Sequence, residues 1–346
     1  MSTLFQIIGS LGIFLFGMKL MSDGLQKMAG ERLRAIMSTM TGNRFKGVFS
    51  GLVVTSAIQS SSATTVMVVS FVNAGLLKLR EAIGVIMGAN LGTTVTAWII
   101  AYFGFTFSLS SIAVPVVGIG MIVTFSKKST LKSFGEFLIG FGLLFLGIEF
   151  LKNSVPDIKA HPELFEWIRS YTNYGFLSVL IFLAFGILLT IIVQSSSVAM
   201  AITMTMAAKG WIGFELSAAI VLGENIGTTI TAILASATGN TNAKRAAIAH
   251  LCFNVIGVIW MLFVFKYFTA AISGIVDASF SKSIAEAAGD PEKLKYIGLT
   301  EKLALFHTMF NATNIVILIG FVPQLEKLAC WLIKSKPNEK KESPAE

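Results

Sequence analysis

Gln59-Ser60-Ser61-Ser62 and Gln194-Ser195-Ser196-Ser197 are identical tetrapeptides in the two halves of the chain, and each is followed by a second shared motif. That motif is Gly-Ala-Asn-Leu-Gly-Thr-Thr at 88–94 and Gly-Glu-Asn-Ile-Gly-Thr-Thr at 223–229, at the same distance from its tetrapeptide in both halves. No net insertion therefore separates the two motifs within either half. Two polar clusters repeated at fixed spacing in an apolar chain indicate a duplicated membrane unit with a paired polar site, which is typical of secondary transporters.

The composition indicates an integral membrane protein. Hydrophobic residues make up 54% of the 346 residues and charged residues only 13%, whereas ordinary soluble domains carry about 25% charged residues. This length can supply about eight to ten spans of roughly 20 residues each. The net charge of +8 is explained by basic cytoplasmic segments, of which 126–132 and the tail from Lys334 are the clearest, and does not indicate nucleic-acid binding. Three His and two Cys are too few for a zinc or iron–sulfur site.

The predicted organisation is all-α, with a first transporter repeat at 1–133, a second repeat with extra C-terminal helices at 134–333, and a charged cytoplasmic tail at 334–346. The apolar run 4–21 is the expected first span, and the amphipathic stretch 23–34 suits the membrane interface. The run 48–77 carries no charge and has the first QSSS stretch in its middle. Because each flanking arm is only about half a bilayer core long as a helix, this run predicts a hairpin or a broken helix.

The second half repeats this pattern with differences. The apolar run 176–193 ends directly at the second QSSS stretch and is long enough to span alone, which weakens the hairpin interpretation there. The segment 142–147 echoes 12–17 and aligns Lys19 with Glu149. These two charges either reach opposite interfaces separately or form an ion pair between the repeats. A charged loop is predicted at 281–302, and His-x-x-Phe-Asn occurs at both 250–254 and 307–311.

A consecutive Gln-Ser-Ser-Ser is costly in hydrocarbon unless its groups find partners or line a wet cavity. At a helix break, Ser hydroxyls and freed N–H groups suit an anion, and the helix dipole favours it. Gln and Asn amides can donate to an anion or coordinate Na⁺ through oxygen. No Lys or Arg occurs in 48–77, 82–126 or 214–243. We therefore expect neutral donors and co-bound cations to hold the anion, which favours ion coupling.

Three alternatives compete with this interpretation. The Ser and Thr residues could mediate helix packing only, as they often do in membranes. A Ser could be the nucleophile of an intramembrane enzyme, but its base would be His250 or His307, and no spacing ties either to QSSS. The chain could also be a membrane interaction protein that does not transport. The exact duplication of both motifs favours a transport site over all three.

Together, the doubled QSSS and G-x-N-[LI]-G-T-T motifs and the segment 246–254 resemble the type II sodium–phosphate cotransporters and their bacterial relatives, over about 11–314. The resemblance implies a multi-pass protein of the plasma (inner) membrane, not an enzyme, that imports inorganic phosphate with Na⁺ by alternating access. It also implies an all-α fold of inverted repeats with broken or re-entrant helices carrying QSSS. The expected partners are phosphate, Na⁺ as the co-transported ion and the lipid bilayer, without an organic cofactor or nucleic acid. Another small anion as substrate stays open, and a homodimer is one assembly considered.

Carried over to this sequence, the resemblance implies two overlapping sets of ligands. The expected phosphate ligands are Gln59, Ser60, Ser61, Ser62, Gln194, Ser195, Ser196, Ser197, Asn90 and Asn225. The expected sodium ligands, some of them supporting, are Gln59, Gln194, Asn90, Thr93, Asn225, Thr228 and Glu224. Glu224 departs from the pattern, because Ala89 occupies its position in the first copy and a small residue is expected there.

Overall fold

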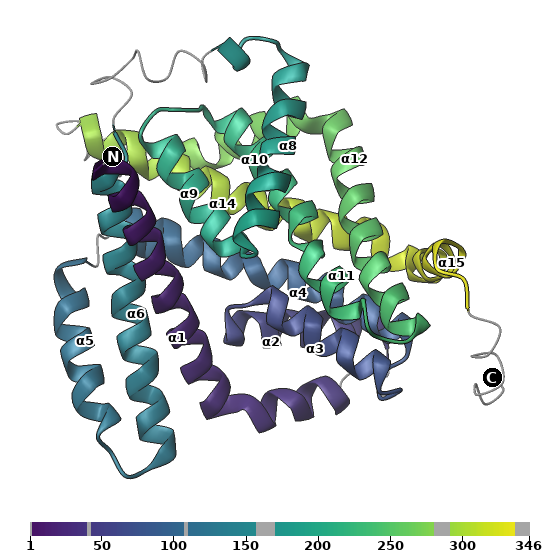
Figure 1. Ribbon diagram of the computed structural model, residues 1–346. Coiled ribbons are helices and arrows are strands. Elements are labelled where there is room, and N and C mark those ends of the chain that lie inside the picture. Colours follow the sequence, from purple (N-terminus) through teal and green to yellow (C-terminus); the bar gives the residue numbers. More distant parts are fainter. Residues whose placement is uncertain (1, 40–42, 107–109, 157–169, 280–290, 336–346) are drawn as a thin grey trace.

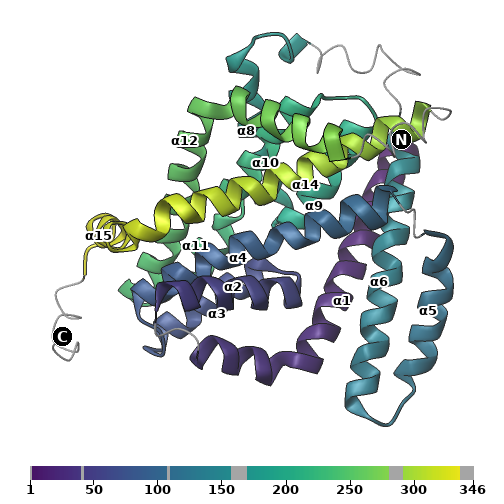
Figure 2. The ribbon, with the colours of Figure 1, turned by 180° about the vertical axis from the view of Figure 1, so that it is seen from behind.

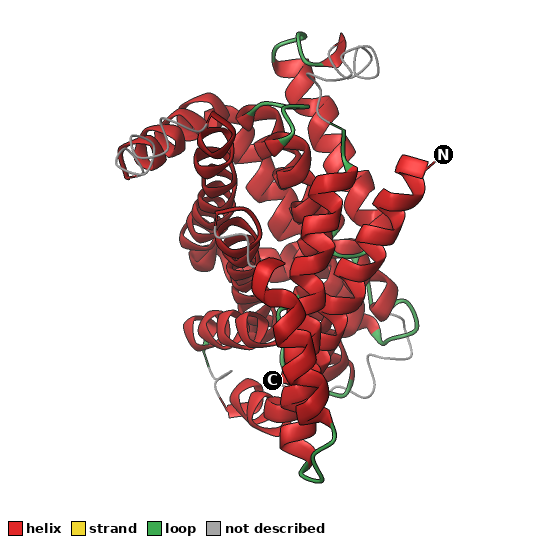
Figure 3. Cartoon of the chain, turned by 90° about the vertical axis from the view of Figure 1, so that its left-hand side faces the viewer, coloured by secondary structure: helices red, strands yellow, loops and turns green. Residues whose placement is uncertain are grey.

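The computed structural model describes residues 2–39, 43–106, 110–156, 170–279 and 291–335, and within these ranges every regular element is a helix (Figures 1 and 3). In chain order the elements are α1 (Ser2–Thr39), α2 (Arg44–Ile58), α3 (Ser61–Asn73), α4 (Leu79–Ile99), the π-helix η1 (Ile100–Thr106), α5 (Ser110–Thr124), α6 (Ser129–Ser154), α8 (Phe176–Val193), α9 (Ser196–Ala208), α10 (Phe214–Gly227), α11 (Thr229–Ser236), α12 (Thr241–Ser279), α14 (Pro291–Leu318), the 3₁₀ helix η3 (Ile319–Phe321) and α15 (Val322–Leu332).

Seven helical segments of the described chain are long and apolar enough to cross a membrane. They are Thr3–Ala29, Leu79–Phe105, Ser129–Ser154, Phe176–Val193, Phe214–Ser236, Thr241–Ser279 and Gly298–Leu332. This is fewer than the eight to ten that chain length allows. The difference arises because QSSS divides the run 48–77 into two short helices and because α5 has only 15 residues.

The stretch 23–34 belongs to α1, which continues without a break to Thr39, and the last turns of α1 bend away from its first part (Figure 1). One expected boundary is wrong. The second part of the predicted loop 281–302 is helical, because α14 already begins at Pro291. Residues 280–290, much of the loop 153–173 and most of the tail lie outside the described residues.

Helices α1 and α6 pack antiparallel through glycines. A Cβ added to Gly17 would overlap the backbone N of Leu144, and one added to Gly147 would lie 2.5 Å from the backbone N of Phe14. The two helices are antiparallel because a later residue of α1, Gly17, contacts an earlier residue of α6, Leu144, while the earlier Phe14 contacts the later Gly147. Only a residue without a side chain permits such an approach, so these glycines fix both the distance and the register of the two helices.

The helices that carry the two shared motifs cross in the same way in both halves of the chain. In the first half, a Cβ on Gly88 of α4 would overlap the carbonyl oxygen of Val48 in α2. In the second half, a Cβ on Gly223 of α10 would overlap the carbonyl oxygen of Leu183 in α8. Gly88 and Gly223 are the first residues of the two copies of the second motif. In each half, backbone contact between the two helices thus occurs eleven residues before the glutamine of the QSSS stretch.

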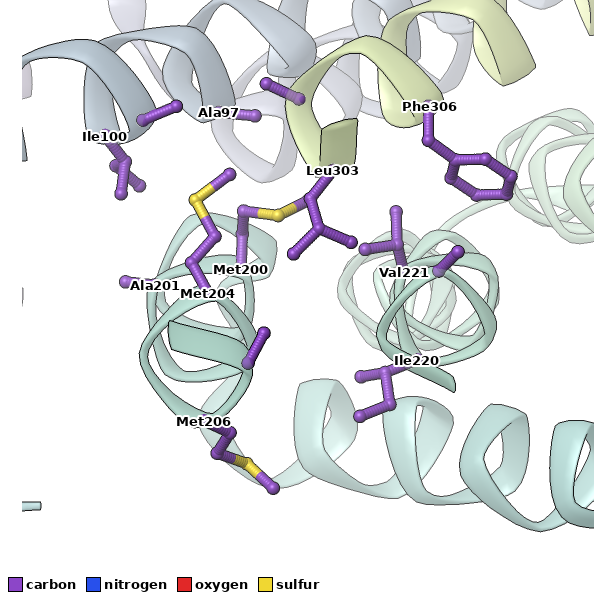
Figure 4. Close-up of a cluster of buried hydrophobic side chains, with 14 of the residues drawn as sticks. Ala97, Ile100, Met200, Ala201, Met204, Met206, Ile220, Val221, Leu303 and Phe306 are labelled. Carbon is purple, nitrogen blue, oxygen red and sulfur yellow. The ribbon is translucent and has the colours of Figure 1, made fainter. Parts of the chain in front are cut away.

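The centre of the molecule is an apolar core between α4, α9, α10 and α14. Met200 and Met204 of α9, Val221 of α10, and Leu303 and Phe306 of α14 are buried there in one cluster, in which Met200 lies beside Leu303 (Figure 4). Helices α4 and α14 run side by side along one face of the molecule (Figure 2). This core holds α9, the helix that follows the second QSSS stretch, against the long helices.

Candidate functional site

Both QSSS stretches interrupt a helix with the same backbone geometry. Gln59 ends α2 with φ 59° and Gln194 ends α8 with φ 55°, and no other described non-glycine residue has a positive φ. The left-handed conformation costs roughly 1–2 kcal/mol for an ordinary residue. Two glutamines in this conformation at matching positions show that each break is specified by the fold, and the second QSSS stretch breaks its helix just as the first does.

The serine after each glutamine starts the next helix. Ser60 caps α3 by accepting a hydrogen bond from the backbone N–H of Ala63 at 3.2 Å, and Ser195 caps α9 by accepting one from Val198 at 3.4 Å. Serine is among the preferred N-cap residues because its hydroxyl satisfies an N–H that the helix leaves free. At each break, the carbonyl end of one helix therefore meets the N–H end of the next.

The two breaks line one cavity of about 250 Å³. Its walls include all eight residues of the two QSSS stretches and Ala63. The third wall is one face of α1, formed by Leu15, Met18, Lys19, Ser22, Asp23 and Gln26. Segments from opposite halves of the chain thus converge on a single polar space.

The two glutamines differ in their surroundings. Gln59 is buried, its Oε1 accepts a hydrogen bond from Oγ1 of Thr96 at 2.9 Å, and its Nε2 donates to the carbonyl oxygen of Ser56 at 2.5 Å. Gln194 is exposed, and its side chain makes no hydrogen bond to any described residue. Gln59 is therefore held in place before any ligand binds, whereas Gln194 is free to turn toward one.

The asparagines of the second motif do not line the cavity. Oδ1 of Asn90 lies 3.3 Å from Nε2 of His250, and Nδ2 of Asn90 donates to Oδ1 of Asn254 at 3.4 Å, so Asn90 binds α4 to α12. Asn225 accepts from Nδ2 of Asn311 at 3.2 Å, which binds α10 to α14. The two His-x-x-Phe-Asn motifs thus face the two asparagines.

The threonines of the second motif are also engaged elsewhere. Thr93 donates to the carbonyl oxygen of Ala89, and Thr228 donates to that of Glu224, each within its own helix. Neither hydroxyl lines the cavity. No histidine does so either among the described residues, so the structure brings no general base to the cavity serines.

Glu224 is buried in α10, with 1% of its surface exposed. Its Oε1 accepts a hydrogen bond from Oγ1 of Thr203 at 2.7 Å, and its Oε2 has no partner among the described residues. The equivalent positions of the first half are occupied by Val68 and Ala89. The polar pair therefore exists only in the second half of the chain, and it lies outside the cavity lining.

The α1 wall was not predicted from the sequence. Lys19 was aligned with Glu149, but the glycine contacts place position 19 of α1 opposite position 142 of α6. Seven residues separate 142 from 149, which is about 10 Å along a helix. Glu149 instead lies 3.5 Å from Nζ of Lys152, so the ion pair between the repeats is wrong. The α1 wall could have been predicted from the sequence, because the polar residues at positions 19, 22, 23 and 26 form a stripe at helical spacing.

Comparisons with known proteins show the family to which this chain belongs. Residues 13–153 and 160–280 match the family described as Na⁺/Pi-cotransporter. The chain belongs to this family, whose members are transporters and not enzymes.

Relatives from bacteria and from humans match this chain, and some of them carry names that describe a function. A Bacillus subtilis protein named YqeW is 31% identical over 327 residues, covering 93% of this chain and 96% of its own. The Escherichia coli "Putative inorganic phosphate export protein YjbB" is 28% identical over 338 residues, which is 97% of this chain but only 57% of the relative. The human "Sodium-dependent phosphate transport protein 2B" is 37% identical over 97 residues, 28% of this chain and 14% of the relative. No solved structure matches.

Proposed function

We propose that the protein is a sodium-coupled symporter that imports inorganic phosphate across the plasma membrane by alternating access. The observation that carries this proposal is the convergence of both QSSS breaks on one cavity. Membership of the Na⁺/Pi-cotransporter family and the names of relatives such as the human protein support the choice of ions.

Phosphate would be held between the N-terminal ends of α3 and α9. Each break offers serine hydroxyls, the free backbone N–H groups of the first helical turn and the positive end of a helix dipole, all of which favour an anion. We assign this role to Gln59, Ser60, Ser61, Ser62, Gln194, Ser195, Ser196 and Ser197. A tetrahedral oxyanion accepts hydrogen bonds on all sides, which suits donors that arrive from two opposed helices.

Sodium would be held at the same breaks by oxygen ligands. The C-terminal ends of α2 and α8 present free carbonyl oxygens, and the amide oxygens of Gln59 and Gln194 lie at those ends. The proposal gives Asn90, Thr93, Asn225 and Thr228 a supporting role, because their side chains bind α12, α14 or their own helices. Glu224 would hold a further cation or a proton.

The packing of α1 and α6 supports the proposal of inverted repeats. The sequence echo pairs Phe14 of α1 with Leu144 of α6, and Gly17 with Gly147. Exchanging each residue for its counterpart turns Phe14 into Leu144 and Gly147 into Gly17. The contact between Phe14 and Gly147 therefore corresponds to a contact between Leu144 and Gly17, and both contacts are present. A twofold axis between two antiparallel helices produces this exchange. Related units with opposite orientation support alternating access, because either unit can open to its own side.

The direction of transport has a second candidate. The Escherichia coli relative is named a phosphate export protein, and a symporter runs in whichever direction its combined gradients favour. In the proposal, import follows from an inward Na⁺ gradient. One chain supplies both QSSS stretches, so the site needs no second subunit, even if the protein forms a homodimer.

The test uses purified protein in proteoliposomes with labelled phosphate. We expect uptake with Na⁺ outside, release of preloaded phosphate when the Na⁺ gradient is reversed, and neither when K⁺ replaces Na⁺. Phosphate flux that is indifferent to Na⁺ would refute sodium coupling. Absence of any phosphate flux under every gradient would refute the proposed function.

A further inference from the structure

The α1 wall is the largest part of the described cavity lining that the twofold relation does not duplicate, and it carries all the charged residues of that lining. Lys19, Ser22, Asp23 and Gln26 follow one another at helical spacing on the face that lines the cavity. Ser22 donates to the carbonyl oxygen of Ile58 at 2.7 Å, and Ile58 is the last residue before Gln59. This bond ties α1 directly to the first break, so its charged side chains are held beside the QSSS residues.

Lys19 lies within a candidate membrane span and has no ion-pair partner among the described residues. It belongs to the span Thr3–Ala29, and its position is roughly 4.5 Å along the axis from the middle of that span. Within the described residues its ammonium group forms no hydrogen bond or ion pair. An unpaired lysine inside a membrane span is costly in hydrocarbon and generally marks a water-filled pathway or a binding site. Among the described residues, Lys19 is also the only basic residue that lines the cavity.

Asp23 lies one helical turn further along the same wall and is the only acidic residue of the lining in the part of the chain that the structure describes. Its carboxylate likewise has no ion-pair partner within 4.0 Å among the described residues. A carboxylate is a hard oxygen ligand suited to a small cation, whereas an ammonium group repels one. The two side chains therefore differ in the ion that each can bind.

We propose that α1 supplies a charged pair to the transport site, in which Lys19 binds the phosphate and Asp23 binds one of the co-transported sodium ions. This assignment rests on the proposed function and extends it to residues outside the QSSS stretches. The pair is neutral as a whole, so a divalent phosphate with two Na⁺ would leave the occupied cavity neutral. Such a cavity can move through the membrane core without carrying a net charge.

The repeat counterpart of Lys19 does not share this role. Glu149 of α6 faces Lys152 and lies outside the cavity lining. The phosphate would accordingly be bound off the twofold axis, on the side nearer α1. Its affinity would then depend on a residue from one repeat only.

The test measures labelled phosphate uptake by proteoliposomes containing wild type, Lys19→Met, Lys19→Gln, Lys19→Arg and Asp23→Asn. Lys27→Met is the matched control, because Lys27 is on the same helix but pairs with Glu136 at 2.6 Å and lies outside the lining. Phosphate dependence is measured at saturating Na⁺, and Na⁺ dependence at saturating phosphate. Thermal unfolding shows that each variant is folded, and the Gln variant keeps a polar side chain at position 19 if the Met variant does not insert.

We expect Lys19→Met and Lys19→Gln to raise the KM for phosphate by about tenfold or more, because a hydrogen bond to a charged group is lost. Lys19→Arg should keep most of the affinity. Asp23→Asn should raise the Na⁺ concentration for half-maximal uptake and change the phosphate KM less, and Lys27→Met should change neither. If the neutral Lys19 variants match the control, the assignment is overturned while the proposed function stands. If wild type transports no phosphate, both fail together.

Discussion

The hydrogen bond between Thr96 and Gln59 offers a sharp test of how the first break is held. Thr96→Val keeps the shape of the side chain but removes the hydroxyl that donates to Oε1 of Gln59 at 2.9 Å. Thr96 is 2% exposed and Gln59 is 6% exposed, so water does not readily replace this donor. A typical hydrogen bond contributes about 0.5–1.5 kcal/mol net, and a buried group left without its partner costs about 1–3 kcal/mol.

These magnitudes set the expected results. Thermal unfolding of purified Thr96→Val should show a loss of stability of about 1–3 kcal/mol. In proteoliposomes, the released Gln59 should raise the KM for labelled phosphate by up to about tenfold, since about 1.4 kcal/mol corresponds to a factor of ten. The maximal rate should change less, because the other ligands remain.

Thr231→Val is the control, since Thr231 occupies the position of the second half that is equivalent to Thr96. Its hydroxyl donates at 3.0 Å to the carbonyl oxygen of Thr228 in its own helix turn and does not contact Gln194. Its loss should therefore leave phosphate uptake close to wild type. If the two variants raise the KM equally, or if neither does, Gln59 is not held in place by Thr96 for ligand binding.

Three further predictions concern other parts of the chain. Gln194→Leu should abolish uptake with little loss of stability, because the exposed Gln194 side chain makes no hydrogen bond to described residues; near wild-type uptake would remove it from the site. Glu224→Gln should alter the Na⁺ or pH dependence of uptake, and unchanged dependence on both would leave Glu224 a purely structural role. Gly88→Ala should lower stability by about 3 kcal/mol or more in thermal unfolding, because the new Cβ would overlap the carbonyl oxygen of Val48. Gly12→Ala, which meets nothing within 4 Å, should not be destabilising, and an equal loss in both variants would contradict the close crossing.

Much of the fold follows from the sequence, because the bilayer restricts the alternatives. Apolar composition predicts membrane helices, and QSSS in the middle of 48–77 predicts the interruption that Gln59 makes in the structure. The length of 176–193 argued less clearly for a break at Gln194, since an apolar run of 18 residues can span the membrane alone. The identity of the motif was the better guide, because the same residues adopt the same left-handed and capping conformations in both copies.

The convergence of the two breaks could not be derived from local patterns. It depends on the close helix crossings at glycines such as Gly88 and Gly223, whose Gly-x-x-x-Gly spacing to Gly92 and Gly227 was an available signal. The role of Asn90 was missed for a related reason. Its partner His250 is 160 residues away, and only the packing of α12 on α4 brings the two side chains together.

In the proposed mechanism, both QSSS stretches bind one oxyanion in the cavity that they share with α1. The most direct measurement is the position of arsenate, a tetrahedral analogue of phosphate, located by anomalous scattering in crystals of the protein grown with Na⁺. We predict one anomalous peak between Gln59–Ser62 and Gln194–Ser197, close to Lys19. A peak elsewhere, such as in the cavity lined by Phe214 and Lys266, or no peak at concentrations that block phosphate uptake, would contradict the account.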